Sequence, residues 1–110
     1  MIPLSGIAWF FGGVFLANSV PHLVNGVSGK TFQTPFARPR GQGKSSAVVN
    51  VIWGTTNLVI AYALLDKLGS FDPHATVDMA VCGLGALLIA LFSAHWFGRF
   101  NGDKTSEEPH

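Results

Sequence analysis

The chain has 110 residues, of which 48% are apolar and only 12% are charged. A soluble domain usually has about 25% charged residues, so this composition is typical of an integral membrane protein. The formal net charge of +1 gives no indication of a nucleic-acid partner, and we expect none. The length accommodates a single domain.

Three long segments contain no Asp, Glu, Lys or Arg: residues 1–29, 45–65 and 79–98. At 1.5 Å per helical residue, each is long enough to cross a bilayer core of about 30 Å. The chain is therefore predicted to be all-α, an integral membrane bundle of three transmembrane helices. The expected spans are about 4–24, 46–65 and 75–97, so residues 1–100 form one domain and 101–110 a polar tail.

The first span is predicted to be a retained helix, because Met1–Ser5 lacks the basic residues with which a secretory signal begins. Pro21 lies near its inner end and is expected to kink or end the helix. Ser45 or Ser46 can cap the second span. Asp78, at the start of the third span, is expected to stabilise the helix N-terminus.

The connector between the first two spans, residues 26–44, contains Gly, Pro and Ser without a helical period. It carries four basic residues, whereas the turn at 66–73 carries only Lys67. The positive-inside rule therefore predicts an N-out/C-in topology with a cytoplasmic connector. Phe32 and Phe36 lie between Lys30 and Arg38, and this mixture of aromatic and basic residues indicates an interfacial anchor on anionic membrane lipids.

The third span contains small residues at a spacing of four, which would let another helix approach closely. Three helices of this length enclose little volume, so we expect a homo-oligomer or a membrane-protein partner. The small-residue stripe begins with an aspartate and consists of Asp78, Cys82, Ala86, Ala90, Ala94 and Gly98.

Polar side chains gather near the cytoplasmic ends of the predicted spans. His22, Asn50 and His95 lie within about a turn of those ends, Asn18 lies a turn deeper and Asn57 lies near the middle of the membrane. Because a polar group facing lipid is costly, these side chains should point inward and bond one another. His22 and His95 are then expected to lie within about 10 Å of each other.

Four interpretations of this polar layer remain open. It can be an interhelical clamp, or a site for a lipid, quinone or other small amphiphile with Trp53 and Trp96 as aromatic walls. It can also be part of an oligomeric transport pathway beside Pro21, or a b-haem or metal site formed by His22 and His95. The candidate ligand-binding residues are His22, Asn18, Asn50, Trp53, Asn57 and His95.

Catalytic motifs are missing from the sequence, which has no nucleophile elbow, phosphate loop or carboxylate pair. We therefore expect a protein that is not an enzyme, with no metal ligand set of recognised spacing and no identified cofactor. The favoured function is a small inner-membrane accessory or binding protein. An oligomeric transporter is the alternative, and haem or metal binding follows it.

Three short runs, Pro21–Gly26, Thr34–Ala37 and Asn50–Gly54, together resemble a group of short bacterial integral-membrane proteins without an assigned activity. The resemblance covers about residues 18–60 and implies a bacterial inner membrane, but no mechanism. The chain differs from small four-span drug exporters, which have an intramembrane Glu, because its first Glu is Glu107.

Overall fold

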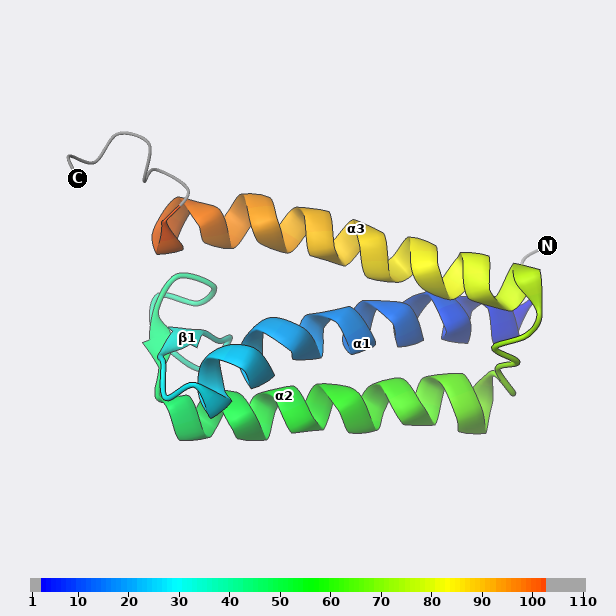
Figure 1. Cartoon of the computed structure of the whole chain (residues 1–110), viewed down its shortest axis with the longest axis horizontal. Coiled ribbons are helices and arrows are strands. Elements are labelled where there is room, and N and C mark those ends of the chain that lie inside the picture. The colour runs from blue at the N-terminus through cyan, green and yellow to red at the C-terminus, as the bar shows by residue number, and fades with distance from the viewer. Residues whose placement is uncertain (1–2, 103–110) are drawn as a thin grey trace.

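The computed structural model describes residues 3–102 and shows an elongated three-helix bundle of 50 × 28 × 23 Å (Figure 1). The helices are α1 (Leu4–Val27), α2 (Ala47–Tyr62) and α3 (Thr76–Asn101). A π-helical segment, η1 (Ala63–Leu68), continues α2 to its end. The connector forms a short hairpin of β1 (Phe32–Gln33) and β2 (Lys44–Ser45).

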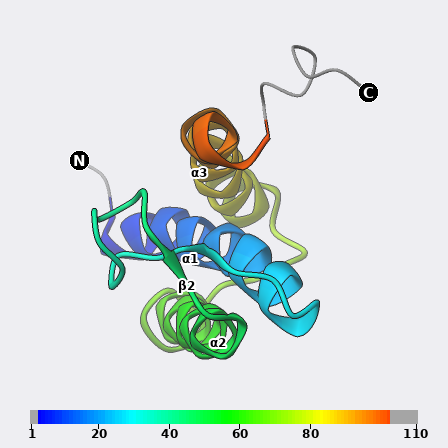
Figure 2. The same ribbon diagram turned by 90° about the vertical axis from the view of Figure 1, so that its left-hand side faces the viewer.

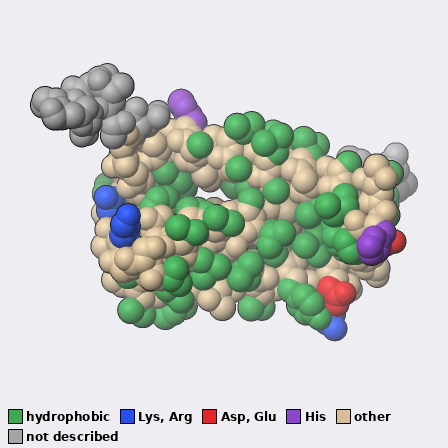
Figure 3. Space-filling model, viewed as in Figure 1, with side chains coloured by type: hydrophobic (Ala, Val, Ile, Leu, Met, Phe, Trp, Pro, Cys, Tyr) green, Lys and Arg blue, Asp and Glu red, His purple; other side chains and the backbone are tan. Residues whose placement is uncertain are grey.

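Each of the three helices, with α2 and η1 counted together, is long and apolar enough to cross a membrane. Their most apolar windows have mean hydropathies of 1.4, 1.7 and 2.1 in chain order. Hydrophobic side chains are spread over the surface of the bundle (Figure 3). Leu88 and Phe92 are among the exposed ones, whereas Ala8, Ala61 and Cys82 are buried. An apolar exterior over a core of small and polar residues is the arrangement expected for a bundle in lipid.

Helix boundaries differ from the predictions mainly at the C-terminal ends. The first helix continues through Pro21 to Val27, so the proline does not end it. The Asn25 side-chain amide donates a 2.7 Å hydrogen bond to the Pro21 carbonyl. Ser46 caps α2 by accepting a 3.2 Å hydrogen bond from the Val49 amide. The third helix extends to Asn101, beyond the expected end at residue 97.

The central helix of the bundle is α1, with α2 and α3 packed on different sides of it (Figure 2). Glycines allow these close approaches. A Cβ at Gly13 would collide with the carbonyl oxygen of Cys82, and one at Gly85 would collide with that of Phe10. Against α2, a Cβ at Gly54 would lie 2.7 Å from the Leu23 side chain. Small residues therefore determine how closely α2 and α3 approach α1.

Only the first part of the small-residue stripe faces α1. Cys82 is buried and Ala86 is half-buried, but Ala90 and Ala94 are exposed. A spacing of four advances about 400°, so the stripe rotates about 40° at each step around the helix. The third helix also diverges from α1 toward the hairpin (Figure 1). The small-residue stripe is therefore an internal contact only as far as Ala86, and the approach of another helix to its remaining part stays a prediction.

The hairpin closes one end of the bundle, where the sequence indicated only an irregular connector. Phe32 pairs with Ser45, and Gln33 pairs with Lys44. The indole nitrogen of Trp96 donates a 2.8 Å hydrogen bond to the Gly41 carbonyl and ties α3 to the hairpin loop. Of the predicted polar tail at 101–110, Asn101 belongs to α3 and residues 103–110 lie outside the described residues.

At the opposite end, the turn between η1 and α3 is held by side-chain hydrogen bonds. The indole nitrogen of Trp9 donates to the Gly69 carbonyl at 2.8 Å. Asp78 is buried and accepts a 3.0 Å hydrogen bond from the Asp72 amide. Asp78 therefore organises the turn that precedes α3.

Candidate functional site

Asn50 is the centre of a buried hydrogen-bond network that joins the hairpin to the helices. Its side chain is fully buried, and its amide nitrogen faces the carbonyls of Phe32, Ser45 and Ser46 at 3.2, 3.1 and 3.0 Å. Because these three partners only accept, the orientation of the Asn50 amide is determined. The Asn50 carbonyl oxygen then lies 2.8 Å from Nδ1 of His22.

This contact determines which nitrogen of neutral His22 carries the proton. The Asn50 oxygen can only accept, so Nδ1 of His22 is the donor, and Nε2 retains a free lone pair. Among residues 3–102, Gln33 Nε2 is the single side-chain nitrogen or oxygen that is both fully buried and without a hydrogen-bond partner. Nε2 of His22 also has no hydrogen-bond partner among these residues. It is therefore not fully buried, and it borders open space.

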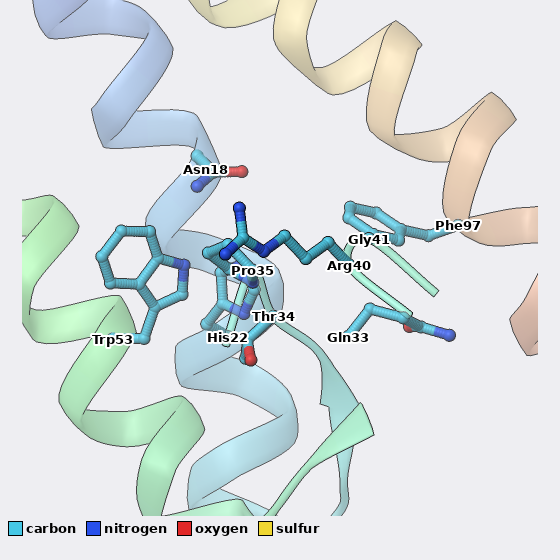
Figure 4. Close-up of a pocket in the computed structure, with 9 residues that line it drawn as sticks. All are labelled: Asn18, His22, Gln33, Thr34, Pro35, Arg40, Gly41, Trp53 and Phe97. Carbon is cyan, nitrogen blue, oxygen red and sulfur yellow. The ribbon is translucent and has the colours of Figure 1, made fainter. Parts of the chain in front are cut away.

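A second amide pair links α1 to α2 in the same way. The Asn57 nitrogen donates to the Trp53 carbonyl at 2.8 Å, which leaves the Asn57 oxygen to accept a 3.0 Å bond from the Asn18 nitrogen. The Asn18 oxygen therefore has no partner among the described residues. In Figure 4 it points away from Trp53, toward the side of Phe97. Like His22 Nε2, it is a free acceptor.

These free acceptors border a cavity of about 220 Å³ between the helices and the hairpin, here called the hairpin cavity. Trp53, Phe97 and Pro35 provide its apolar walls, from α2, α3 and the hairpin loop (Figure 4). Its lining residues are Asn18, His22, Gln33, Thr34, Pro35, Arg40, Gly41, Trp53 and Phe97.

Two donors lie in the same cavity. The Arg40 side chain extends from the loop toward α1, and the indole nitrogen is on the edge of Trp53 that faces the other labelled residues (Figure 4). Neither group has a hydrogen-bond partner among residues 3–102. The ion pair found in that part of the chain joins Lys67 to Asp66, at the opposite end of the bundle. Arg40 is therefore a cation without a carboxylate beside it.

Charge is distributed unevenly along the bundle. Lys30, Arg38, Arg40 and Lys44 belong to the connector that forms the hairpin, and Arg99 lies in the last turn of α3. The aspartates of the described residues, Asp66, Asp72 and Asp78, follow α2 or begin α3 at the other end (Figure 3). The hairpin cavity is thus at the basic end.

The structure brings five of the six candidate residues together. His22, Asn18 and Trp53 line the cavity, while Asn50 and Asn57 are fully buried and orient His22 and Asn18.

His95 does not join this group and is exposed, contrary to the expectation that it faces the bundle. Around α3 it lies about 80° from Gly85 and about 140° from Cys82, which both contact α1. Trp96, the other expected wall, bonds to the loop instead, and the neighbouring Phe97 lines the cavity.

Sequence reasoning missed the contribution of the connector to this site. Gln33, Thr34 and Pro35 enter the cavity because the hairpin folds back over the helix ends, and two-residue strands leave no periodic signal. The sequence indicates only an interfacial anchor for the basic and aromatic residues of the connector, among which is Arg40. Within residues 3–102, no group of three His, Cys, Asp or Glu side chains is arranged to hold a metal ion.

Comparisons with protein-family models, with curated proteins and with solved structures found no match to this chain. The possible roles of the hairpin cavity therefore follow from its own shape and chemistry.

Proposed function

We propose that the protein is a non-enzymatic accessory or binding protein of a bacterial inner membrane. Its hairpin cavity binds the polar head of a lipid, a quinone or another small amphiphile. The supporting observation is that unpaired donors and acceptors, from Arg40, Trp53, His22 and Asn18, share one cavity with aromatic walls. A clamp that only joined helices would use these groups to bond one another.

The size of the cavity supports a head group rather than a whole ligand. Sites for drug-sized molecules occupy about 300–1,000 Å³. The hairpin cavity has about 220 Å³. A head group fills this space while its hydrocarbon chains remain in the bilayer beside the exposed apolar side chains of the helices.

The proposed topology is N-out/C-in, with the hairpin in the cytoplasm. The concentration of Lys and Arg around the hairpin supports it, because basic residues are retained on the cytoplasmic side. The cavity then lies in the inner leaflet, at the depth of lipid head groups.

Association with a second copy or with another membrane protein belongs to the same proposal. The exposed small side chains of Ala90 and Ala94 support it, since such residues let helices approach closely in lipid.

Transport and haem ligation have less support from the described residues. The transport hypothesis used a helix broken at Pro21, but α1 continues through this residue. The haem hypothesis used His22 and His95 as a pair, but His95 is exposed and does not line the cavity that His22 borders.

The test is to purify the protein in a mild detergent, extract it with organic solvent and identify co-purifying molecules by mass spectrometry. We expect one class of amphiphile to be enriched over its share in the membrane, and this enrichment to fall in Arg40→Gln. Arg38→Gln is the matched control, because Arg38 is an exposed arginine of the same loop that does not line the cavity. No enrichment of any amphiphile in the unaltered protein would refute the proposal.

A further inference from the structure

The unpaired polar groups that are accessible in the hairpin cavity form two sets with opposite hydrogen-bonding roles, and the fully buried Gln33 nitrogen is not among them. Arg40 and the Trp53 indole N–H can only donate, and Arg40 also carries a positive charge. Nε2 of His22 and the Asn18 oxygen can only accept in the network described above. A ligand that satisfies both sets must present an anionic acceptor to one and hydrogen-bond donors to the other.

The two acceptors are also spaced for a pair of donors. Asn18 and His22 are four residues apart on α1, and such residues lie on the same face of a helix with Cβ atoms about 5–6 Å apart. Both side chains are held in place by α2, through Asn57 and Asn50. Adjacent hydroxyl groups on a short carbon chain match two neighbouring acceptors.

We propose that the hairpin cavity selects an anionic lipid whose phosphodiester head carries vicinal hydroxyls, as in phosphatidylglycerol. The phosphate lies against Arg40 and the Trp53 N–H, and the hydroxyls donate to His22 Nε2 and the Asn18 oxygen. This inference rests on the proposed function and narrows it. A quinone fits less well, because its carbonyls only accept and would leave the two acceptors unpaired.

The charge environment favours the same ligand. Arg40 has no carboxylate partner among the described residues, and the connector adds Lys30, Arg38 and Lys44 at the same end of the bundle. Basic groups close to a membrane surface attract anionic lipids. Charge alone would favour every anionic lipid equally, so the two acceptors carry the specific part of the proposal.

The experiment measures lipid retention by the purified full-length chain in detergent micelles, using native mass spectrometry with lipids added one at a time. The probes are phosphatidylglycerol, phosphatidylethanol, phosphatidylcholine and a ubiquinone. Phosphatidylethanol is an anionic phosphodiester without hydroxyls, and phosphatidylcholine has no net charge. We expect phosphatidylglycerol to bind about fivefold more tightly than phosphatidylethanol, and phosphatidylcholine to bind most weakly.

Two pairs of variants assign the selectivity to residues. Arg40→Gln should remove the preference for anionic lipids, whereas Arg38→Gln should retain it. Asn18→Ala should reduce the preference for phosphatidylglycerol over phosphatidylethanol, whereas Asn25→Ala should retain it. Asn25 is an asparagine of the same helix whose amide bonds to the Pro21 carbonyl, and it does not line the cavity. Helical content by circular dichroism shows that each variant is folded.

The soluble head group, glycerophosphoglycerol, distinguishes a membrane lipid from a free solute as the source of this chemistry. We expect it to compete weakly, because it lacks the hydrocarbon chains. Equal binding of phosphatidylglycerol and phosphatidylethanol would overturn the inference and leave the proposed function intact, as would preferential binding of a quinone. If the protein binds no lipid and no quinone, both the inference and the proposed function are overturned. If glycerophosphoglycerol binds as tightly as phosphatidylglycerol, the assignment of the ligand as a membrane lipid is overturned.

Discussion

Replacing Asn50 by alanine tests the hydrogen-bond network on which the cavity depends. The change leaves the His22 Nδ1–H without its 2.8 Å partner and removes side-chain donors from the carbonyls of Phe32 and Ser45. The Ser46 carbonyl keeps the Asn50 backbone amide at 3.0 Å. An unsatisfied buried N–H costs about 1–2 kcal/mol and each weakened carbonyl about 0.5–1 kcal/mol, so the loss in stability should be about 2–4 kcal/mol.

The assay is equilibrium unfolding in mixed detergent micelles, with Asn57→Ala as the matched control. Asn57 is also fully buried on α2, but its oxygen accepts one interhelical hydrogen bond, from Asn18. Such bonds average about 0.6 kcal/mol in membrane proteins, with a maximum near 1.7 kcal/mol. Asn50→Ala should therefore destabilise the protein more than Asn57→Ala. An equal or smaller loss for Asn50→Ala would refute the assignment of Asn50 as the centre of the network.

Three further predictions concern packing, topology and the hairpin loop. Gly13→Ala should destabilise the bundle by about 1–3 kcal/mol in the same assay, because its Cβ collides with the Cys82 backbone. The control Gly83→Ala, whose Cβ meets nothing within 4 Å, should be neutral or stabilising by up to about 1 kcal/mol. Equal effects would contradict the described contact between α1 and α3. A cysteine at Ser70 should react with a membrane-impermeant reagent in intact cells, and one at Gln42 only after permeabilisation; the reverse pattern would invert the proposed topology. Trp96→Phe should increase hydrogen exchange in the loop around Gly41 several-fold by removing the 2.8 Å indole bond, while unchanged exchange would show that the bond does not hold the loop.

The three helices were predictable because charge-free segments of sufficient length have few alternative structures. The helix ends were less predictable. The first helix continues past the polar Asn25 and the third continues as far as Asn101. The side chains of Asn25 and Asn101 each bond to a carbonyl within their own helix, those of Pro21 and Phe97 respectively. The hairpin was not predicted, because strands of two residues show no alternation of apolar and polar side chains.

The inward orientation of His22 and Asn50 followed from the cost of exposing polar groups to lipid. The same argument did not place His95, which is exposed on this chain, since depth along the membrane gives the height of a residue but not its direction around the helix axis. The partners of Asn50 were also out of reach, because its three acceptor carbonyls belong to the hairpin and the start of α2. The way in which the connector folds back over the helix ends has to be known before these contacts can be predicted.

The central position of α1 has a consequence for the order of assembly during synthesis. Because α2 and α3 each pack on α1, the helix that is synthesised first among the three is the template for the other two. The α1–α2 pair can form, together with the hairpin and the His22–Asn50 contact, before α3 has been translated. Arrival of α3 then adds Phe97 to the cavity wall and Trp96 to the loop. The last helix to enter the membrane is thus the one that completes the cavity.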